Sequence, residues 1–250
     1  MPARNYRQIS TGKTVKGCTT ILNILSKPAL IFWGYKQGMS NFDRLMQIIA
    51  YTPESMDTDR DREILHVLIK DFKPTGLYDK RDKAADAGTL AHLFVENHLR
   101  GISEPKTDGL PQEVISKAEG CYLTFLDWEK ANIKKVIDSE IEITSEQYAF
   151  GGTIDYVIEG PNTPKGMVDI LDIKTGKDIY LEAKIQVKSY SKLYEEHHPE
   201  LPVAGFHILR LGENGEFTHK YFPNLDNKYF GIFLDCLDIT EKLSELGEKL

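Results

Sequence analysis

The segment from Phe150 to Tyr190 limits what this chain can fold into more than any other part of the sequence. It holds two runs with the composition of β-strands, Gly152–Ile158 and Met167–Thr175, joined by a stretch with proline, glycine and asparagine. A helical run follows from about Tyr180. We therefore expect two paired strands that lead directly into a helix.

Three of the charged side chains on these two strands, those of Asp155, Asp172 and Lys174, could meet on one face. Side chains alternate between the faces of a strand, so Asp172 and Lys174 share one face, and Leu171 and Ile173 share the other. If the strands pair as a hairpin, Asp155 comes level with Asp172, and two carboxylates and an ammonium group gather on one face. Burying them is costly unless a cation completes the cluster, as Mg²⁺ would. Alone, an Asp-x-Lys sequence is more often a solvated strand face.

Two helices carry polar residues that could join this cluster. Gln186 and Tyr190 are four residues apart on the helix after the hairpin, so they share a face. An expected helix over residues 80–99 carries a second set at helical spacing: Gly88, Thr89, His92 and Glu96. The glycine in that set would let its helix approach another element closely.

Four motifs follow one another along the chain: GT-x-x-H, GG-T-I-D, D-I-K-T-G-K and Q-x-x-x-Y. As an ordered set they resemble the RecB-like branch of the PD-(D/E)XK nucleases, which includes phage-encoded exonucleases, the RecB nuclease domain and CRISPR-associated RecB-like nucleases. The resemblance spans about residues 84–194. Arg81 and the flank Lys27–Trp33 also look like those of phage members.

The resemblance implies a catalytic role for Asp155, Asp172 and Lys174. It implies that His92, Asp155, Asp172 and the backbone carbonyl of Ile173 hold a metal ion, and neutral imidazole suits that role. Lys174 would then stand beside the attacking water and the phosphate, where it would position the nucleophile and stabilise negative charge.

Further residues are implied to contact the substrate. In the family, the motif that Gln186 and Tyr190 match packs behind the site and reaches the DNA, so both are expected to position substrate. Thr175 and Lys177 are expected to touch phosphate.

Two more acidic residues are candidates for the site. Glu96 could orient His92 or hold a water ligand. The resemblance also places an acidic residue on the strand before GG-T-I-D, expected over residues 134–144. We favour Glu142 over Glu140 there, although a solvated edge charge explains Glu142 equally well.

The order of elements predicts an α/β fold with a restriction-endonuclease-like core, in which helices flank a mixed central sheet. We expect residues 1–78 to form an N-terminal helical lobe and residues 79–250 to form the nuclease core. Within the lobe, residues 1–17 are expected to be extended or frayed. Helices are expected from Pro28 to about Gln37, from Ser40 or Asn41 to about Ala50, and over Asp59–Phe72.

The formal net charge of −7 does not by itself indicate nucleic-acid binding. The field at a site depends on nearby charges rather than on the total. Five lysines cluster near the expected site: Lys174, Lys177, Lys184, Lys188 and Lys192. We therefore expect DNA binding that is modest and sensitive to salt.

The mixed oxygen and nitrogen ligand set favours Mg²⁺ or Mn²⁺ as the cofactor. The three cysteines, Cys18, Cys121 and Cys236, are far apart in the sequence, and no pair has metal-ligand spacing. We therefore expect no iron–sulfur cluster, unlike in some RecB-like relatives, and a location in the cytoplasm. No apolar run approaches ~18 residues, so we expect no membrane partner.

Taken together, these features favour a metal-dependent DNA exonuclease that hydrolyses phosphodiester bonds, encoded by a phage or virus and acting in recombination, repair or genome processing. One alternative is a structure-specific endonuclease of the same superfamily. Another is a non-catalytic DNA-binding accessory to a helicase or a single-strand annealing protein. The intact acid and lysine set argues against the accessory, but sequence does not separate cutting at ends from internal cutting.

Overall fold

The computed structural model describes residues 5–25, 28–50, 63, 66–67, 77–176, 178–212 and 216–247. The chain divides into two compact units, one made of Met1–Leu25 with Asp86–Leu250 and the other of Ser26–Ala85. The larger unit contains every expected site residue that the structure describes, so its fold decides how those residues meet.

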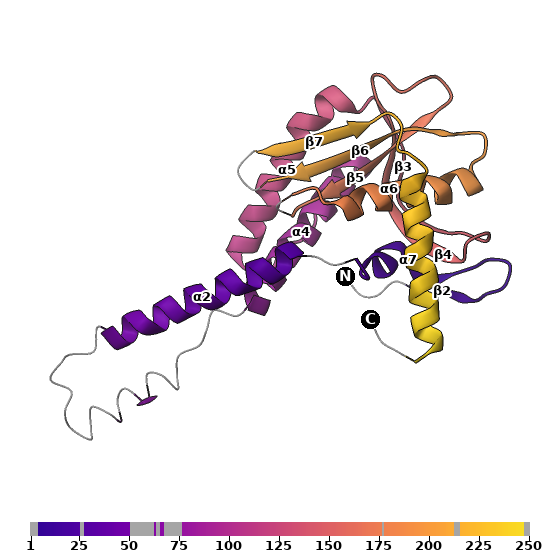
Figure 1. The fold of residues 1–250 in the computed structure, drawn as a ribbon. Coiled ribbons are helices and arrows are strands. Elements are labelled where there is room, and N and C mark those ends of the chain that lie inside the picture. Colours follow the sequence, from indigo (N-terminus) through magenta and orange to yellow (C-terminus); the bar gives the residue numbers. More distant parts are fainter. Residues whose placement is uncertain are drawn as a thin grey trace. The chain divides into compact units, whose positions relative to one another are not determined.

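A seven-stranded mixed sheet lies at the centre of the larger unit (Figure 1). The order of the strands is β1-β2-β4-β5-β6-β7, and β3 pairs with β4 beside this path. The β2–β4 and β5–β6 pairs are parallel, and the other pairs are antiparallel. The strands are β1 (Tyr6–Arg7), β2 (Thr14–Gly17), β3 (Lys135–Thr144), β4 (Phe150–Glu159), β5 (Val168–Lys174), β6 (Val203–Leu211) and β7 (Phe217–Phe222).

Three helices cover one face of the sheet: α1 (Cys18–Leu22), α6 (Leu181–His197) and α7 (Lys228–Glu245). They share an apolar core with strand residues that include Ile170 and Ile208, both fully buried. Burying apolar side chains of this size contributes about 1.5–3 kcal/mol each, so this layer fixes α6 firmly on the sheet.

Two further helices, α4 (Leu77–Arg100) and α5 (Gln112–Asn132), pack on the opposite face. Their core residues, such as Phe94 and Phe125, meet Leu171 from β5. The expected fold class is confirmed, because the structure is α/β with a mixed central sheet flanked by helices.

Strand β4 has one neighbour along one edge and two along the other. β3 pairs with it from Gly151 to Glu159. On the opposite edge, β2 pairs at Phe150 and Gly151, and β5 pairs from Tyr156 to Ile158. The intervening stretch, 152–155, therefore faces a gap between the ends of β2 and β5 within the described sheet.

The N-terminal segment, expected to be extended or frayed, is extended in β1 and β2 and pairs with the sheet, which we did not expect. Two glycines make this pairing possible, because a Cβ at Gly17 or at Gly151 would lie 2.7 or 2.4 Å from the Tyr6 side chain. The Tyr6 hydroxyl also lies 3.0 Å from Thr153 Oγ1, within hydrogen-bond distance. Thus β1, β2 and α1, from the range expected to form the helical lobe, are parts of the larger unit.

Elements after residue 110 match the expected order closely. The sequence predicts strands over Val203–Leu211 and Phe217–Phe222, and β6 and β7 have these bounds. It predicts a helix from Pro111 to about Ile133, and α5 is shorter by one residue at each end. The hairpin of β4 and β5 leads directly into α6, as expected.

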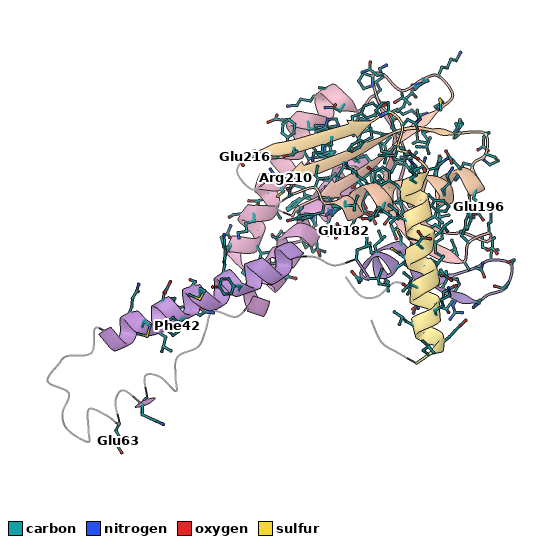
Figure 2. The ribbon with its side chains drawn as sticks, in the orientation of Figure 1. Phe42, Glu63, Glu182, Glu196, Arg210 and Glu216 are labelled. Carbon is teal, nitrogen blue, oxygen red and sulfur yellow. The ribbon has the colours of Figure 1, made fainter. Side chains whose placement is uncertain are left out.

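In the smaller unit, α2 (Pro28–Ala50) is one continuous helix where we expected two. Gly38 lies within it, and an interior glycine costs about 1 kcal/mol relative to alanine without having to end a helix. Phe42 lies on this helix (Figure 2). The expected helix over residues 59–72 lies outside the described residues except at 63, 66 and 67, which are helical.

Glu196 fastens the turn between β3 and β4 to the C-terminal part of α6, while Glu182 marks the start of the same helix (Figure 2). The Glu196 carboxylate accepts hydrogen bonds from Ser145 Oγ and from the backbone N–H of Glu146, both at 2.7 Å. Because α6 is also packed into the core, the helix that carries Gln186 and Tyr190 is held both by its buried face and by its C-terminal part.

The cysteines and the helices bear on two expectations made from composition. Cys18, Cys121 and Cys236 are all buried as free thiols. Within the described part of the chain, no helix is long and apolar enough to span a bilayer.

Candidate active site

Asp172 and Lys174 form an ion pair at the C-terminal end of β5. The Lys174 Nζ atom donates a hydrogen bond of 2.8 Å to Asp172 Oδ1 and lies 2.7 Å from Oδ2. The Asp172 side chain is 1% exposed and that of Lys174 is 30% exposed, so the carboxylate is buried while the lysine side chain is partly exposed. The two side chains share a face, as strand alternation predicts.

Asp155 lies level with this pair. The last β4–β5 pairing joins Tyr156 to Leu171, and the same register one residue further sets Asp155 opposite Asp172, as expected. Here a side chain replaces the regular ladder, because the backbone N–H of Ile173 donates a 2.9 Å hydrogen bond to Asp155 Oδ2. Asp155 thereby links the end of β5 to β4 at the gap beside β2.

Three residues from three elements form a group that could hold a metal ion. His92 from α4, Glu140 from β3 and Asp155 from β4 each offer one ligand atom, and these atoms lie within 4.8 Å of one another. All three side chains are half-buried. Asp172 is not part of this group, but its charge influences the pKa of His92, so the two clusters adjoin.

The acidic residue that β3 contributes to this group is Glu140, whereas we favoured Glu142 from the sequence. Glu142 is exposed and pairs with Thr153. Glu140 has a φ of 50°, a left-handed conformation that is uncommon for residues other than glycine. Such a residue interrupts the regular alternation of a strand, and the pairing of β3 also shifts between Val136 and Asp138. Alternation alone therefore could not choose between the two glutamates.

Glu96, the other acidic candidate, forms an ion pair of 2.6 Å with Arg100, one turn further along α4. Its expected role beside His92 stays a prediction.

The electrostatics of the site follow from burial and from the lysine. Burial lowers the pKa of His92 and Lys174 lowers it further, so the imidazole is neutral and able to bind a metal. A hydrogen bond between His92 and the backbone of Ile173 raises the pKa of the imidazole. A hydrogen bond that raises this pKa is one that the imidazole N–H donates, so the Ile173 carbonyl is the acceptor. The expected role of that carbonyl as a metal ligand stays a prediction.

The two members of the ion pair differ in what burial does to them. Burial raises the pKa of Asp172 to about 6, although the Lys174 charge opposes this. Burial would lower the pKa of Lys174, but the charges of Asp172 and Asp155 outweigh it and raise that pKa. The lysine is therefore an ammonium ion at neutral pH.

Gln186 and Tyr190 on α6 connect to the ion pair through a chain of hydrogen bonds. Lys174 Nζ donates to Gln186 Oε1 at 3.2 Å, and Gln186 Nε2 donates to the Tyr190 hydroxyl at 2.7 Å. Gly152 makes room for this arrangement, because a Cβ there would lie 2.6 Å from the Tyr190 ring. The structure thus brings together Lys174 and the motif on the following helix.

Gly88 allows α4 to approach the end of β5 closely, as its place in the sequence predicts. A Cβ at Gly88 would lie 2.5 Å from Thr175 Oγ1. This approach brings His92, one turn further along α4, to the site. Lys177, an expected phosphate contact, lies outside the described residues, as do the side chains of Trp33 and Arg81.

The residues present fit a divalent metal ion. Imidazole nitrogen with carboxylate oxygen is a ligand set that Mg²⁺ and Mn²⁺ accept. In addition, Asp172 Oδ2 is buried and receives no well-aligned hydrogen bond from the described residues, despite the nearby ammonium group. Because buried polar atoms normally have a partner, this oxygen has capacity for one more interaction.

Comparisons with known proteins give limited information. No protein-family model matches the chain, and no curated protein matches it. It is similar to a solved structure from Eubacterium rectale named "putative exonuclease", with 15% identity, 66% of this chain and 69% of that chain covered, and a TM-score of 0.43. It is also similar to the crystal structure of SSO0001, with 14% identity, 64% and 74% covered, and a TM-score of 0.34.

Proposed function

We propose that this chain is a metal-dependent DNA nuclease that acts as an exonuclease. The observation that carries the proposal is the convergence of His92, Glu140 and Asp155 beside the Asp172–Lys174 ion pair. Half-buried carboxylates at this density repel one another and lose solvation, so they are costly to a protein that has no cation to hold.

His92, Glu140 and Asp155 would hold the metal, with Asp172 adjacent. When bound, a divalent ion there stabilises charge on a phosphate and lowers the pKa of a bound water. The Lys174 ammonium stabilises the negative charge that develops on the phosphate and orients the water by hydrogen bonding. Gln186 accepts a hydrogen bond from Lys174 and so holds the ammonium group in place, while Tyr190 anchors Gln186.

DNA as substrate, action from an end, and a phage role in recombination, repair or genome processing are parts of this proposal that rest on the ordered motifs. Action with a helicase or a single-strand annealing protein belongs to it in the same way. An endonuclease would need the same ligands and lysine, so the site residues are equally compatible with internal cutting. A non-catalytic accessory is disfavoured, because binding DNA requires neither the buried carboxylate of Asp172 nor the metal group.

The test is digestion of end-labelled linear single- and double-stranded DNA with Mg²⁺, Mn²⁺ or EDTA. We expect metal-dependent cleavage that Lys174→Ala lowers by about 10²–10³-fold, the size of effect that follows loss of one charge-stabilising donor. Lys130→Ala is the matched control, because Lys130 is 74% exposed on α5 and pairs only with Asp127 among the described residues. Circular dichroism of each variant verifies the fold.

Each result has a definite meaning. Cleavage that persists in Lys174→Ala contradicts the assignment. Absence of cleavage by a folded wild-type protein that still binds DNA supports the accessory alternative. Circular single-stranded DNA separates the two modes of cutting, because an exonuclease leaves it intact and an endonuclease opens it.

A further inference from the structure

A second group of buried polar side chains lies on the face of the sheet that α4 and α5 cover. Asp169 is three residues before Asp172 on β5, so strand alternation directs it to the opposite face. It is 1% exposed. His207 from β6 and His219 from β7 lie beside it, joined by the β5–β6 and β6–β7 pairings.

These residues form one hydrogen-bonded chain. Asp169 Oδ2 lies 2.5 Å from Thr163 Oγ1 and 3.4 Å from His207 Nε2. His207 Nδ1 lies 2.9 Å from His219 Nε2, and the two rings are nearly parallel at 3°. In the neutral pair, His207 Nε2–H donates to the carboxylate and His219 Nε2–H donates to His207 Nδ1, an assignment that follows from the network.

The chain leaves one oxygen of the carboxylate open. Both hydrogen bonds go to Oδ2, and Asp169 Oδ1 is buried with no hydrogen-bond partner among the described residues. A carboxylate oxygen without a donor in such a place is uncommon, because it has lost water without a replacement.

A pocket of about 160 Å³ adjoins this carboxylate. Asp169 lines it with both imidazoles, Tyr221 and turn residues that include Gly160 and Asn162. The Tyr221 ring is fixed, because it lies over Gly205 so closely that a Cβ there would come within 2.5 Å of it. The pocket therefore adjoins one carboxylate whose Oδ1 has no hydrogen-bond partner among the described residues. Its lining includes the rings of His207, His219 and Tyr221 beside the amides of Asn132 and Asn162.

The charges around the pocket favour a positive occupant. Burial lowers the pKa of His219 to about 4, and the adjacent His207 lowers it too, so His219 is neutral at pH 7. Lys134 is near the rim, but its ammonium group donates to the Pro161 carbonyl at 3.0 Å. Apart from His207, which lies against Oδ2, no charged group that the structure describes is within ion-pair distance of Asp169.

We propose that this pocket binds an organic cation of the guanidinium class, whose N–H groups donate to Asp169 Oδ1 while its plane lies against the Tyr221 and imidazole rings. Guanidinium suits such a site, because it is planar, weakly hydrated and stacks on rings. The group could belong to a free small molecule or to an arginine side chain of another protein. A bound water is the simplest competitor, because it could also donate to Oδ1.

The test is isothermal titration calorimetry of the full chain with methylguanidinium chloride at constant ionic strength, beside methylurea as a neutral molecule of the same shape. We expect millimolar or tighter saturable binding of methylguanidinium and none of methylurea. Asp169→Asn should weaken binding by at least about tenfold, because the ligand then meets no charge. Tyr221→Leu keeps the carboxylate and should weaken binding several-fold, which provides a second measurement if Asp169→Asn does not fold.

Further arms separate sources and sites. Binding of the tripeptide Gly-Arg-Gly as tight as that of methylguanidinium indicates an arginine side chain from a partner, and much weaker binding indicates a free molecule. Asp172→Asn should leave binding unchanged, and Asp169→Asn should leave DNA cleavage unchanged, so the proposed function is tested independently. Equal affinity for methylurea, unaltered binding by Asp169→Asn, or a crystal structure with only water at Oδ1 in millimolar methylguanidinium would overturn the proposal.

Discussion

The backbone N–H of Ile173 is hydrogen bonded to the carboxylate of Asp155 across 2.9 Å, at the point where the β4–β5 ladder ends. The Asp155 side chain thus accepts a hydrogen bond in place of a backbone carbonyl of β4, and it also contributes to the group with His92 and Glu140. Structure and chemistry are therefore coupled at this residue, and substitutions of different kinds should separate them.

For Asp155, we predict that asparagine and alanine will differ in stability but not in activity. An asparagine side chain would keep an oxygen that can accept from Ile173 and lose only the charge, whereas alanine loses both. Asp155→Ala should lower the free energy of unfolding by about 1–3 kcal/mol relative to Asp155→Asn, the cost of leaving a buried donor unpaired. Urea denaturation and a cleavage assay check this, and equal stabilities would contradict the linking role.

For the two glutamates of β3, we predict that only Glu140 matters for metal binding. Glu140→Gln removes a ligand charge from the group with His92 and Asp155 and should weaken Mn²⁺ binding by about 10–100-fold, the range typical of altered metal sites. Glu142→Gln is the matched control on the same strand and should change it less than about twofold. Titration calorimetry measures the Mn²⁺ affinity of both variants. A larger loss of affinity in Glu142→Gln than in Glu140→Gln would identify Glu142 as the ligand instead.

For Gly88, we predict a steric conflict that a second substitution relieves. Gly88→Ala places a methyl group 2.5 Å from Thr175 Oγ1, and the strain should cost about 1–3 kcal/mol. In a Thr175→Ala background the nearest remaining atom at that site is the Cβ of residue 175 at 3.5 Å, an ordinary contact. There the higher helix propensity of alanine should stabilise by about 0.5–1 kcal/mol. A double-mutant cycle by thermal denaturation decides, and additive effects would argue against the contact.

For His219, we predict a specific loss of stability in acid. The pKa of its folded form is lowered from 6.5 to about 4, so the unfolded chain takes up this proton at higher pH than the folded chain does. Its contribution to the free energy of unfolding is fully present above pH 6.5, decreases as pH falls below 6.5, and is lost once pH has fallen through about 4. The groups that face it are His207 on β6, Tyr221 on β7 and Trp128 on α5, with Asp169 beyond His207.

His219→Gln should therefore flatten the decline in the free energy of unfolding between pH 6.5 and pH 4. Chemical denaturation of the wild type and the variant at several pH values gives the difference between their free energies of unfolding. Groups that titrate in the same way in both proteins cancel in this difference. A difference that does not depend on pH would show that His219 has an ordinary pKa.

Much of the fold could be predicted from sequence because it depends on local pattern. β6 and β7 have the predicted bounds, since two runs rich in apolar residues are separated by the sequence Gly-Glu-Asn-Gly-Glu, which is typical of a hairpin turn. The Asp172–Lys174 pair could be found for the same reason, because two residues on one strand face are neighbours whatever the rest of the chain does.

Features that join distant segments could not be predicted. The pairing of the N-terminus with β4 depends on Tyr6 fitting over Gly17 and Gly151, and neither glycine signals this locally. The position of Glu140 depends on a left-handed backbone within a strand. The group of Asp169, His207 and His219 comes from three strands, with no spacing in the sequence to connect them.

The left-handed backbone at Glu140 sets the stability of this protein against its proposed activity. Glycine would adopt that conformation without strain, whereas glutamate holds it at a cost of order 1–3 kcal/mol. Relieving the strain in this way would remove the carboxylate at the same time. Selection for heat resistance alone would thus favour glycine at this position and discard the chemistry, so resilience and activity make opposite demands on a single residue.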